Sequence, residues 1–122
     1  MRELIKDPGR IAHMLEMARL VEIEKSRHTL EELANDMVLF YGLSKMIEFI
    51  GEAAYMISKE FKESHTQLPW RQIEGMRHIL VHGFYSMSDT VLWDVVQNDI
   101  PELIPVLEAY VDEMAKGSAQ LG

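Results

Sequence analysis

The chain has 122 residues, enough for one domain with a hydrophobic core that needs no covalent cross-links. Its formal net charge of −8 argues against a domain that simply coats nucleic acid, and its lack of cysteine excludes disulfides and thiolate metal sites. The sequence shows neither an apolar run long enough to span a bilayer nor a signal-peptide pattern at its N-terminus, so it predicts a cytoplasmic protein with no membrane partner.

The first predicted helix begins at Asp7-Pro8. An acidic residue followed by proline is typical of a helix start, with Asp7 as the N-cap and Pro8 as the first helical residue. The apolar stripe that follows predicts a helix to about Lys25. No segment of the chain shows the sustained alternation of a strand.

The second helical stretch begins at Thr29. The order Thr29-Leu-Glu-Glu32 is a capping box, in which the two side chains bind each other's backbone N–H groups. It opens a stretch that reaches about Lys62, with at most one break, near Asn35.

This long stretch carries two apolar stripes with the spacing of packed bundle helices. One stripe contains four small residues, Ser44, Gly51, Ala54 and Ser58, which would let another backbone approach closely. A helix with two apolar stripes is covered on two sides. Either it is the central helix of the monomer, or one stripe meets a second copy of the chain.

The C-terminal half predicts three further helical segments. Pro69 precedes a helix over residues 70–82 that Gly83 stops, and another helix starts at 86–88 and ends near 97. Pro101 and Pro105 predict a kink or restart near 98–99, before a last helix to about Lys116 and a flexible tail from about 117. The predicted fold is therefore all-α: an up-and-down bundle of four to five helices in a single domain, residues 1–122.

Acidic residues dominate the chain after residue 85. Residues 86–115 hold seven acidic side chains and no Lys or Arg. The simpler interpretation is a solvated helix face, and the alternative is a site for a basic partner.

Residues 70–85, WRQIEGMRHILVHGFY, combine a core stripe with a polar stripe. Helical spacing places Ile73, Met76, Leu80 and Phe84 in the core, and it places Arg71, Gly75, His78 and His82 roughly opposite. Arg77 falls near the edge of the core stripe, so one straight helix does not aim Arg77 and His82 at the same point. The length of arginine, the helix end at Gly83 or a second subunit must close the gap.

Three chemistries are compatible with these residues. His78 and His82 are four residues apart, a spacing that suits two metal ligands, but no carboxylate and no third ligand accompany them, so we predict no metal and no cofactor. Both histidines could instead face solvent or cap the helix end. The third possibility is metal-free phosphodiester cleavage, which needs a proton-transfer group near neutral pKa and a fixed cation beside the phosphorus.

Four segments together carry a family resemblance. The run at 70–85, IGEAA at 50–54, VLWDVV at 91–96 and DIPEL at 99–103 resemble the HepT-like branch of the HEPN superfamily. These proteins are small helical toxins paired with a minimal nucleotidyltransferase antitoxin. Their motif is arginine, four residues, histidine, one residue, tyrosine, which Arg77 and His82 match. Phe84 stands where the family has its tyrosine, and Tyr85 follows one residue later.

The resemblance implies a homodimeric, metal-independent endoribonuclease that uses the 2′-hydroxyl of its RNA substrate as nucleophile. His82 would be the general acid or base, Arg77 would stabilise the charge on phosphorus, and His78 and Arg71 would be auxiliary phosphate contacts. In the family the partner enzyme adenylylates the motif tyrosine to silence the toxin, which makes Tyr85 the candidate site here. The alternative is a catalytically silent helical module that binds the nucleotidyltransferase or a nucleotide, and the net charge favours it slightly.

Overall fold

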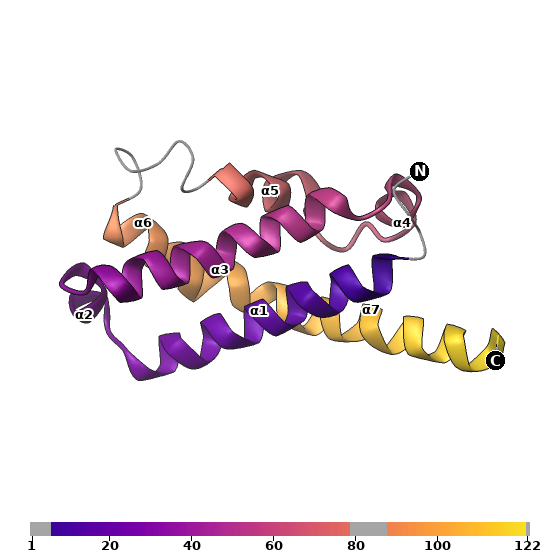
Figure 1. Ribbon diagram of the computed structural model, residues 1–122, viewed down its shortest axis with the longest axis horizontal. Helices are drawn as coiled ribbons and strands as arrows, with labels where there is room; N and C mark the ends of the chain where they lie inside the picture. The colour runs from indigo at the N-terminus through magenta and orange to yellow at the C-terminus, as the bar shows by residue number, and fades with distance from the viewer. Residues whose placement is uncertain (1–5, 79–87, 122) are drawn as a thin grey trace.

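The computed structural model describes residues 6–78 and 88–121, which form helices joined by short connections, with no strand among them. The predicted all-α bundle is confirmed. The chain runs along the bundle in α1 (Asp7–Arg27), turns through the short α2 (Leu30–Ala34), and returns in α3 (Met37–Met56) (Figure 1). At the far end lies α4 (Lys59–Ser64), after which α5 (Trp70–Gly75) runs back along α3.

The last part of the bundle is one continuous helical stretch of changing type. It consists of α6 (Asp89–Asp94), the π-turn η3 (Val95–Asp99) and α7 (Ile100–Leu121). The kink predicted near 98–99 takes the form of this π-turn, in which the Ile100 N–H donates to the Val95 carbonyl. Pro101 has no N–H and its ring crowds the carbonyl four residues earlier, which disfavours a regular α-turn there. The helix continues past Lys116 to Leu121, so the predicted helix end is wrong.

Helix-capping side chains mark the beginnings of α2 and α3. Thr29 accepts from the Glu32 backbone N–H at 3.1 Å and Glu32 accepts from the Thr29 N–H at 3.0 Å, which confirms the capping box. The predicted break near Asn35 is also present, and Asp36 caps α3 by accepting from the Leu39 N–H at 3.0 Å.

The start of α1 differs from the prediction. Lys6 is the N-cap and Asp7 is the first helical residue, so the N-cap role assigned to Asp7 is wrong. The Asp7 side chain is 1% exposed and accepts hydrogen bonds from the backbone N–H and the hydroxyl of Ser58, at 2.9 and 2.6 Å. Ser58 is itself the N-cap of α4 and marks a second interruption in the stretch that was predicted to reach Lys62 with at most one break, near Asn35. A buried carboxylate thereby joins the beginning of α1 to the corner between α3 and α4.

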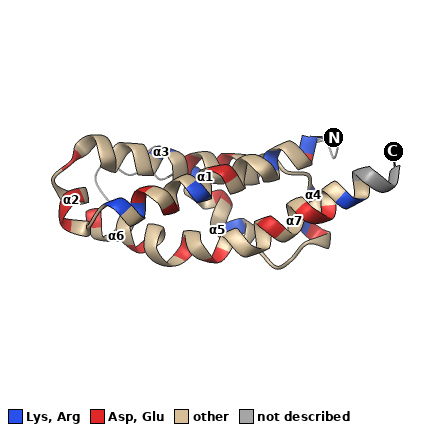
Figure 2. Cartoon of the chain, turned by 90° about the horizontal axis from the view of Figure 1, so that it is seen from below, with Lys and Arg blue, Asp and Glu red and all other residues tan. Residues whose placement is uncertain are grey.

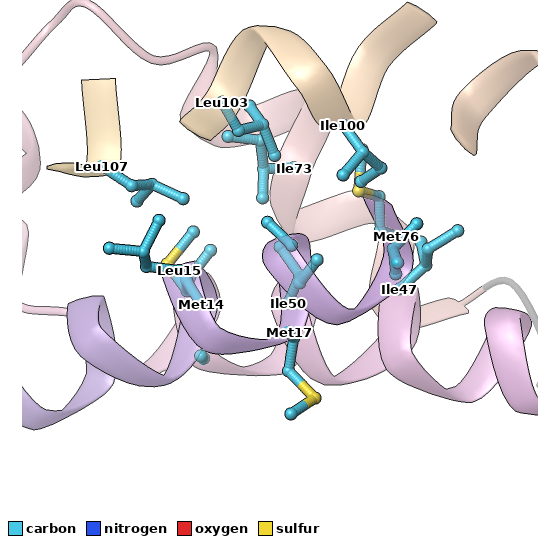
Figure 3. Close-up of a cluster of buried hydrophobic side chains, with 14 of the residues drawn as sticks. Met14, Leu15, Met17, Ile47, Ile50, Ile73, Met76, Ile100, Leu103 and Leu107 are labelled. Atoms are coloured by element: carbon cyan, nitrogen blue, oxygen red, sulfur yellow. The ribbon is translucent and has the colours of Figure 1, made fainter. Parts of the chain in front are cut away.

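Helix α3 is the central helix of the monomer. It packs against α1 on one side and against α5 and η2 on another. The small residues Ser44, Gly51 and Ala54 of its first stripe are buried within the chain, and so is Ser58 just beyond its end. Apolar side chains from α1, α3, α5, η2 and α7 meet in one core, of which Figure 3 labels Met14, Leu15, Met17, Ile47, Ile50, Ile73, Met76, Ile100, Leu103 and Leu107. The small-residue stripe therefore does not support a dimer contact, because it is used inside the monomer.

Candidate functional site

Arg77 lies in the 3₁₀-turn η2 (Met76–His78), which directly follows α5. The sequence predicted one α-helix over 70–82, but α5 ends at Gly75, the residue with the weakest helix propensity in that segment. In a 3₁₀-turn each residue advances by about 120° rather than 100°, so the regular wheel does not hold for Arg77 and His78. Met76 is buried as predicted, Arg77 is half-buried and His78 is exposed. The predictions for Leu80, His82, Phe84 and Tyr85 lie outside the described residues.

Gly51 allows this turn to approach α3 very closely. A Cβ atom built on Gly51 would lie 2.4 Å from the backbone N of Arg77 and 2.9 Å from the Ile73 carbonyl oxygen. Real Cβ atoms do not approach backbone atoms so closely, so only glycine fits between α3 and η2. The close backbone approach predicted from the small residues of α3 is therefore made by the Arg77 segment of the same chain.

The Arg77 side chain is held on two sides. Its guanidinium carbon lies 3.9 Å from the centroid of the Tyr55 ring, which is one helical turn beyond Gly51 on α3. Its Nη1 donates to the Glu74 carbonyl oxygen at 3.2 Å. Tyr55 is half-buried and was not among the predicted site residues. Its spacing of four from Gly51 was the available signal, since residues i and i+4 share one helix face.

An ion pair joins α4 to α5 close to Arg77 and Tyr55. Lys62 of α4 reaches the Glu74 carboxylate at 2.7 Å and the Tyr55 carbonyl oxygen at 3.5 Å. Both charged side chains are largely buried, with 17% and 24% of their surface exposed. Because water screens this pair less than a surface pair, its two charges attract each other more strongly, and the pair links α4 to α5. Tyr55, Lys62, Glu74 and Arg77 thus form a closed circuit of contacts.

The other predicted phosphate contacts lie on exposed surface. Arg71 is exposed on α5 and His78 is exposed at the end of η2. Together with Arg77 they bring up to three cationic groups to the segment 71–78.

A cavity of about 140 Å³ beside α5 has acidic rather than basic side chains in its lining. It is lined by Gln67, Leu68, Pro69, Gln72, Ile73, Met76, Asp99, Glu102 and Leu103. Partial burial raises the pKa of the Asp99 carboxyl, and the nearby charges of Asp94 and Glu102 raise it further. A cavity lined by carboxylates repels phosphate, so it is not a candidate for the predicted anion site.

The acidic run is mostly a solvated face. Five of its seven side chains are exposed and the other two are partly exposed, and the acidic positions recur along α7 in Figure 2. Glu108 pairs with Arg19 at 2.7 Å and Glu113 contacts His65 at 2.9 Å. These carboxylates already have partners in the same chain, which favours the simpler of the two interpretations.

Two further properties concern only the described residues. No group of three or more histidine, aspartate and glutamate side chains there is arranged to hold a metal ion, and the predicted pair of His78 with His82 lies partly outside this range. Among the same residues, no helix combines the length and the apolar character needed to cross a membrane.

Comparison with known proteins gives one consistent family. The family model described as "Ribonuclease HepT-like" matches residues 14–110. "Putative RNase TTE0752" of Caldanaerobacter subterraneus subsp. tengcongensis is 31% identical over 93 residues, which are 76% of this chain and 83% of that protein. "Probable ribonuclease HepT" of Thermococcus cleftensis is 33% identical over 88 residues, or 72% and 80% of the two chains. No solved structure is significantly similar to the chain.

Proposed function

Because the chain belongs to the ribonuclease HepT-like family, we propose that it is an endoribonuclease that cleaves RNA without a metal ion. The structural observation that supports this activity best is the immobilised, half-buried Arg77 at the surface of α5 and η2. A cation fixed in this way suits an anionic transition state, because little reorganisation is needed when charge develops.

The proposed reaction is an intramolecular displacement at phosphorus. The RNA 2′-oxygen attacks the adjacent phosphate, the bond to the 5′-oxygen breaks, and the products are a 2′,3′-cyclic phosphate and a 5′-hydroxyl. His82 takes the proton from the 2′-hydroxyl or gives one to the departing 5′-oxygen. Arg77 binds the non-bridging oxygens as their charge grows, and His78 and Arg71 contact flanking phosphates.

We propose further that the protein acts in the cytoplasm as the toxin of a toxin–antitoxin pair, with a small nucleotidyltransferase as antitoxin. The likeness to the HepT-like family supports this role. Control would act through adenylylation of Tyr85, which adds a bulky phosphodiester group next to the proposed catalytic segment.

A homodimer is also part of the proposal. The adjacent apolar side chains of Met37 and Val38 at the start of α3, with 72% and 84% of their surface accessible, support a contact with another chain, because exposed apolar patches often mark protein interfaces. Two copies of the segment 71–82 facing each other would let His82 of one chain meet Arg77 of the other. A mass of one chain at micromolar concentration, measured by light scattering, would contradict this part of the proposal.

The activity is tested by incubating the purified protein with a structured RNA and a single-stranded RNA in excess chelator. Cleavage is expected to persist and to leave 2′,3′-cyclic phosphate ends, which an end-specific phosphatase assay identifies. Loss of cleavage in chelator, with recovery on addition of zinc, would show a metal enzyme. No cleavage of any RNA would favour the alternative supported by the −8 net charge, a silent module that binds the nucleotidyltransferase or a nucleotide.

A further inference from the structure

We propose that Tyr55 is a positioning residue of the ribonuclease site, whose ring holds the Arg77 guanidinium in the orientation that meets the scissile phosphate. This inference rests on the proposed function and adds to it a residue outside the Arg-x4-His motif. It begins from the contact of 3.9 Å between the guanidinium carbon and the ring centroid.

The backbone of α3 makes this contact possible. Gly51 brings the Arg77 backbone against α3, and Tyr55 lies one turn further along the same face. The main chain of Arg77 therefore rests on the glycine while its side chain rests on the aromatic ring. Neither residue carries a charge that would neutralise the guanidinium.

The stacking leaves the guanidinium able to bind an anion. A guanidinium has five N–H donors in one plane, and an aromatic ring covers a face without taking any of them. Within residues 6–78 and 88–121, the Arg77 guanidinium donates one hydrogen bond, from Nη1 to the Glu74 carbonyl oxygen at 3.2 Å. The remaining donors lie in the plane of the guanidinium and are not covered by the ring, and in this plane arginine can bind two phosphate oxygens at once.

Tyr55 is itself held in place. Its carbonyl oxygen is 3.5 Å from Lys62 Nζ, and Lys62 pairs at 2.7 Å with Glu74, the residue whose carbonyl receives the Arg77 hydrogen bond. Movement of Tyr55 would therefore disturb both contacts of the guanidinium. Such double support is what keeps a long arginine side chain, with its high rotamer entropy, in a single orientation.

A second cation–aromatic pair on α3 provides a matched control. Lys45 Nζ lies 5.3 Å from the Phe49 ring centroid, on an exposed part of the helix. Phe49→Leu removes an aromatic ring from the same helix and from a cation, but away from Arg77. This variant measures how RNA cleavage responds when α3 loses an aromatic ring that does not contact Arg77.

The experiment compares wild type, Tyr55→Phe, Tyr55→Leu and Phe49→Leu by single-turnover cleavage of one RNA in chelator. Tyr55→Phe keeps the ring and is expected to cleave like the wild type. Tyr55→Leu is expected to lose about 10–100-fold in the maximal rate with a smaller change in the RNA concentration for half-maximal rate, because a misplaced Arg77 fails mainly in the transition state. Phe49→Leu is expected to match the wild type.

A second readout does not depend on activity. The side-chain Nε–H resonance of Arg77 in a ¹⁵N–¹H spectrum, assigned with Arg77→Lys, is expected to carry a ring-current shift that Tyr55→Phe retains and Tyr55→Leu abolishes. Circular dichroism establishes that each variant is folded. If Tyr55→Leu does not fold, Tyr55→Met replaces it, since a flexible apolar chain fills the space without an aromatic face.

The outcomes separate the two proposals. An active wild type with a folded, equally active Tyr55→Leu or Tyr55→Met overturns the positioning role and leaves the ribonuclease proposal standing. Equal losses in Tyr55→Phe and Tyr55→Leu also overturn it, because the hydroxyl and not the ring would then matter. An unchanged Arg77 resonance in the variant without the ring overturns the stacking itself. A wild type that cleaves no RNA overturns the proposed function and, with it, the catalytic purpose of the contact.

Discussion

Asp7 and Ser58 are 51 positions apart in the sequence, yet the Ser58 hydroxyl donates to the buried Asp7 carboxylate at 2.6 Å. The Ser58 backbone N–H donates to the same carboxylate at 2.9 Å, and the Ser58 hydroxyl accepts from the Phe61 N–H at 3.1 Å. One carboxylate thus orders the first turn of α1 and the first turn of α4.

The first prediction concerns this pair. Asp7→Asn is expected to lower the free energy of unfolding by about 1.5–3 kcal/mol, because an amide has one acceptor oxygen where the carboxylate has two and its N–H₂ group would face donors. Urea unfolding measures the change. Asp36→Asn is the control, since Asp36 is exposed and asparagine is an equally good N-cap. Equal losses in the two variants would contradict a special role for the buried pair.

The second prediction concerns the contact of α3 with η2. Gly51→Ala is expected to lower the free energy of unfolding by about 1–3 kcal/mol and to reduce RNA cleavage, since its Cβ would collide with the Arg77 backbone. Gly42→Ala on the same helix has open space around the added methyl group. It is expected to raise the stability by about 0.5–1 kcal/mol. A stabilising effect of both substitutions in urea unfolding would refute the close approach.

The third prediction follows from the raised pKa of Asp99, which comes first from burial and then from Asp94 and Glu102. A carboxyl whose pKa is higher in the folded state opposes folding once it is charged, and this penalty disappears below its unfolded pKa of about 3.9. Asp99→Asn is therefore expected to stabilise the protein at pH 7, by an amount that shrinks as the pH falls toward 3.9. Asp112→Asn, at an exposed position of α7, gives the background effect of losing one charge. If urea unfolding shows that Asp99→Asn gains the same stability at every pH, the raised pKa of Asp99 is not the cause of the gain.

The fourth prediction concerns catalysis. His82→Ala is expected to lower the cleavage rate by about 10²–10⁴. Arg77→Ala is expected to cost a comparable factor, because the charge developing on phosphorus would be uncompensated. His78→Ala is expected to have the smallest effect, since its proposed role is a phosphate contact without proton transfer. Single-turnover rates measure all three, and a loss in His78→Ala as large as in His82→Ala would reverse the assignment. All three variants are expected to fold, with Arg77→Ala the least stable because it removes the contact between the guanidinium and the Tyr55 ring.

The fifth prediction concerns regulation. With a cognate nucleotidyltransferase and ATP, adenylylation is expected on Tyr85 and is expected to stop RNA cleavage. Tyr110 is a poor acceptor, since it is 3% exposed and its hydroxyl donates to Gln67 at 2.7 Å. Peptide mass spectrometry locates the modification, with Tyr85→Phe as the negative variant and the half-exposed Tyr41→Phe as the control. Adenylylation found on the Tyr41 peptide would show that the nucleotidyltransferase regulates the protein at another surface.

Features encoded over three or four neighbouring residues could be predicted from the sequence. The capping box at Thr29 and the break at Asn35 were found because their partners are adjacent along the chain. Ser58 was instead assigned to an unbroken small-residue stripe, because the residue that fixes its role, Asp7, is remote in sequence. The kink near Asp99 was predicted from proline chemistry, but proline alone does not distinguish a π-turn from a restart.

The residues of the candidate site also differ in whether the sequence alone could predict them. The segment of Arg77 and His78 was recognisable from its motif, which is contiguous in sequence. Tyr55 was not, because a half-buried tyrosine near the end of an apolar helix looks like ordinary packing until the partner segment is placed against it. The 3₁₀-turn at Arg77 was not predicted either, since it accompanies the packing of η2 against Gly51, which helical periodicity does not reveal.

The packing of α1 against α7 has a consequence for how the protein is made. These are the first and last helices, and they lie side by side in the bundle (Figure 1). While the ribosome is still synthesising α7, one side of α1 has no cover, and the core that includes Leu107 and Tyr110 is incomplete. The core therefore closes only after α7 has been synthesised, so chaperones have access to the earlier helices while the bundle is still incomplete.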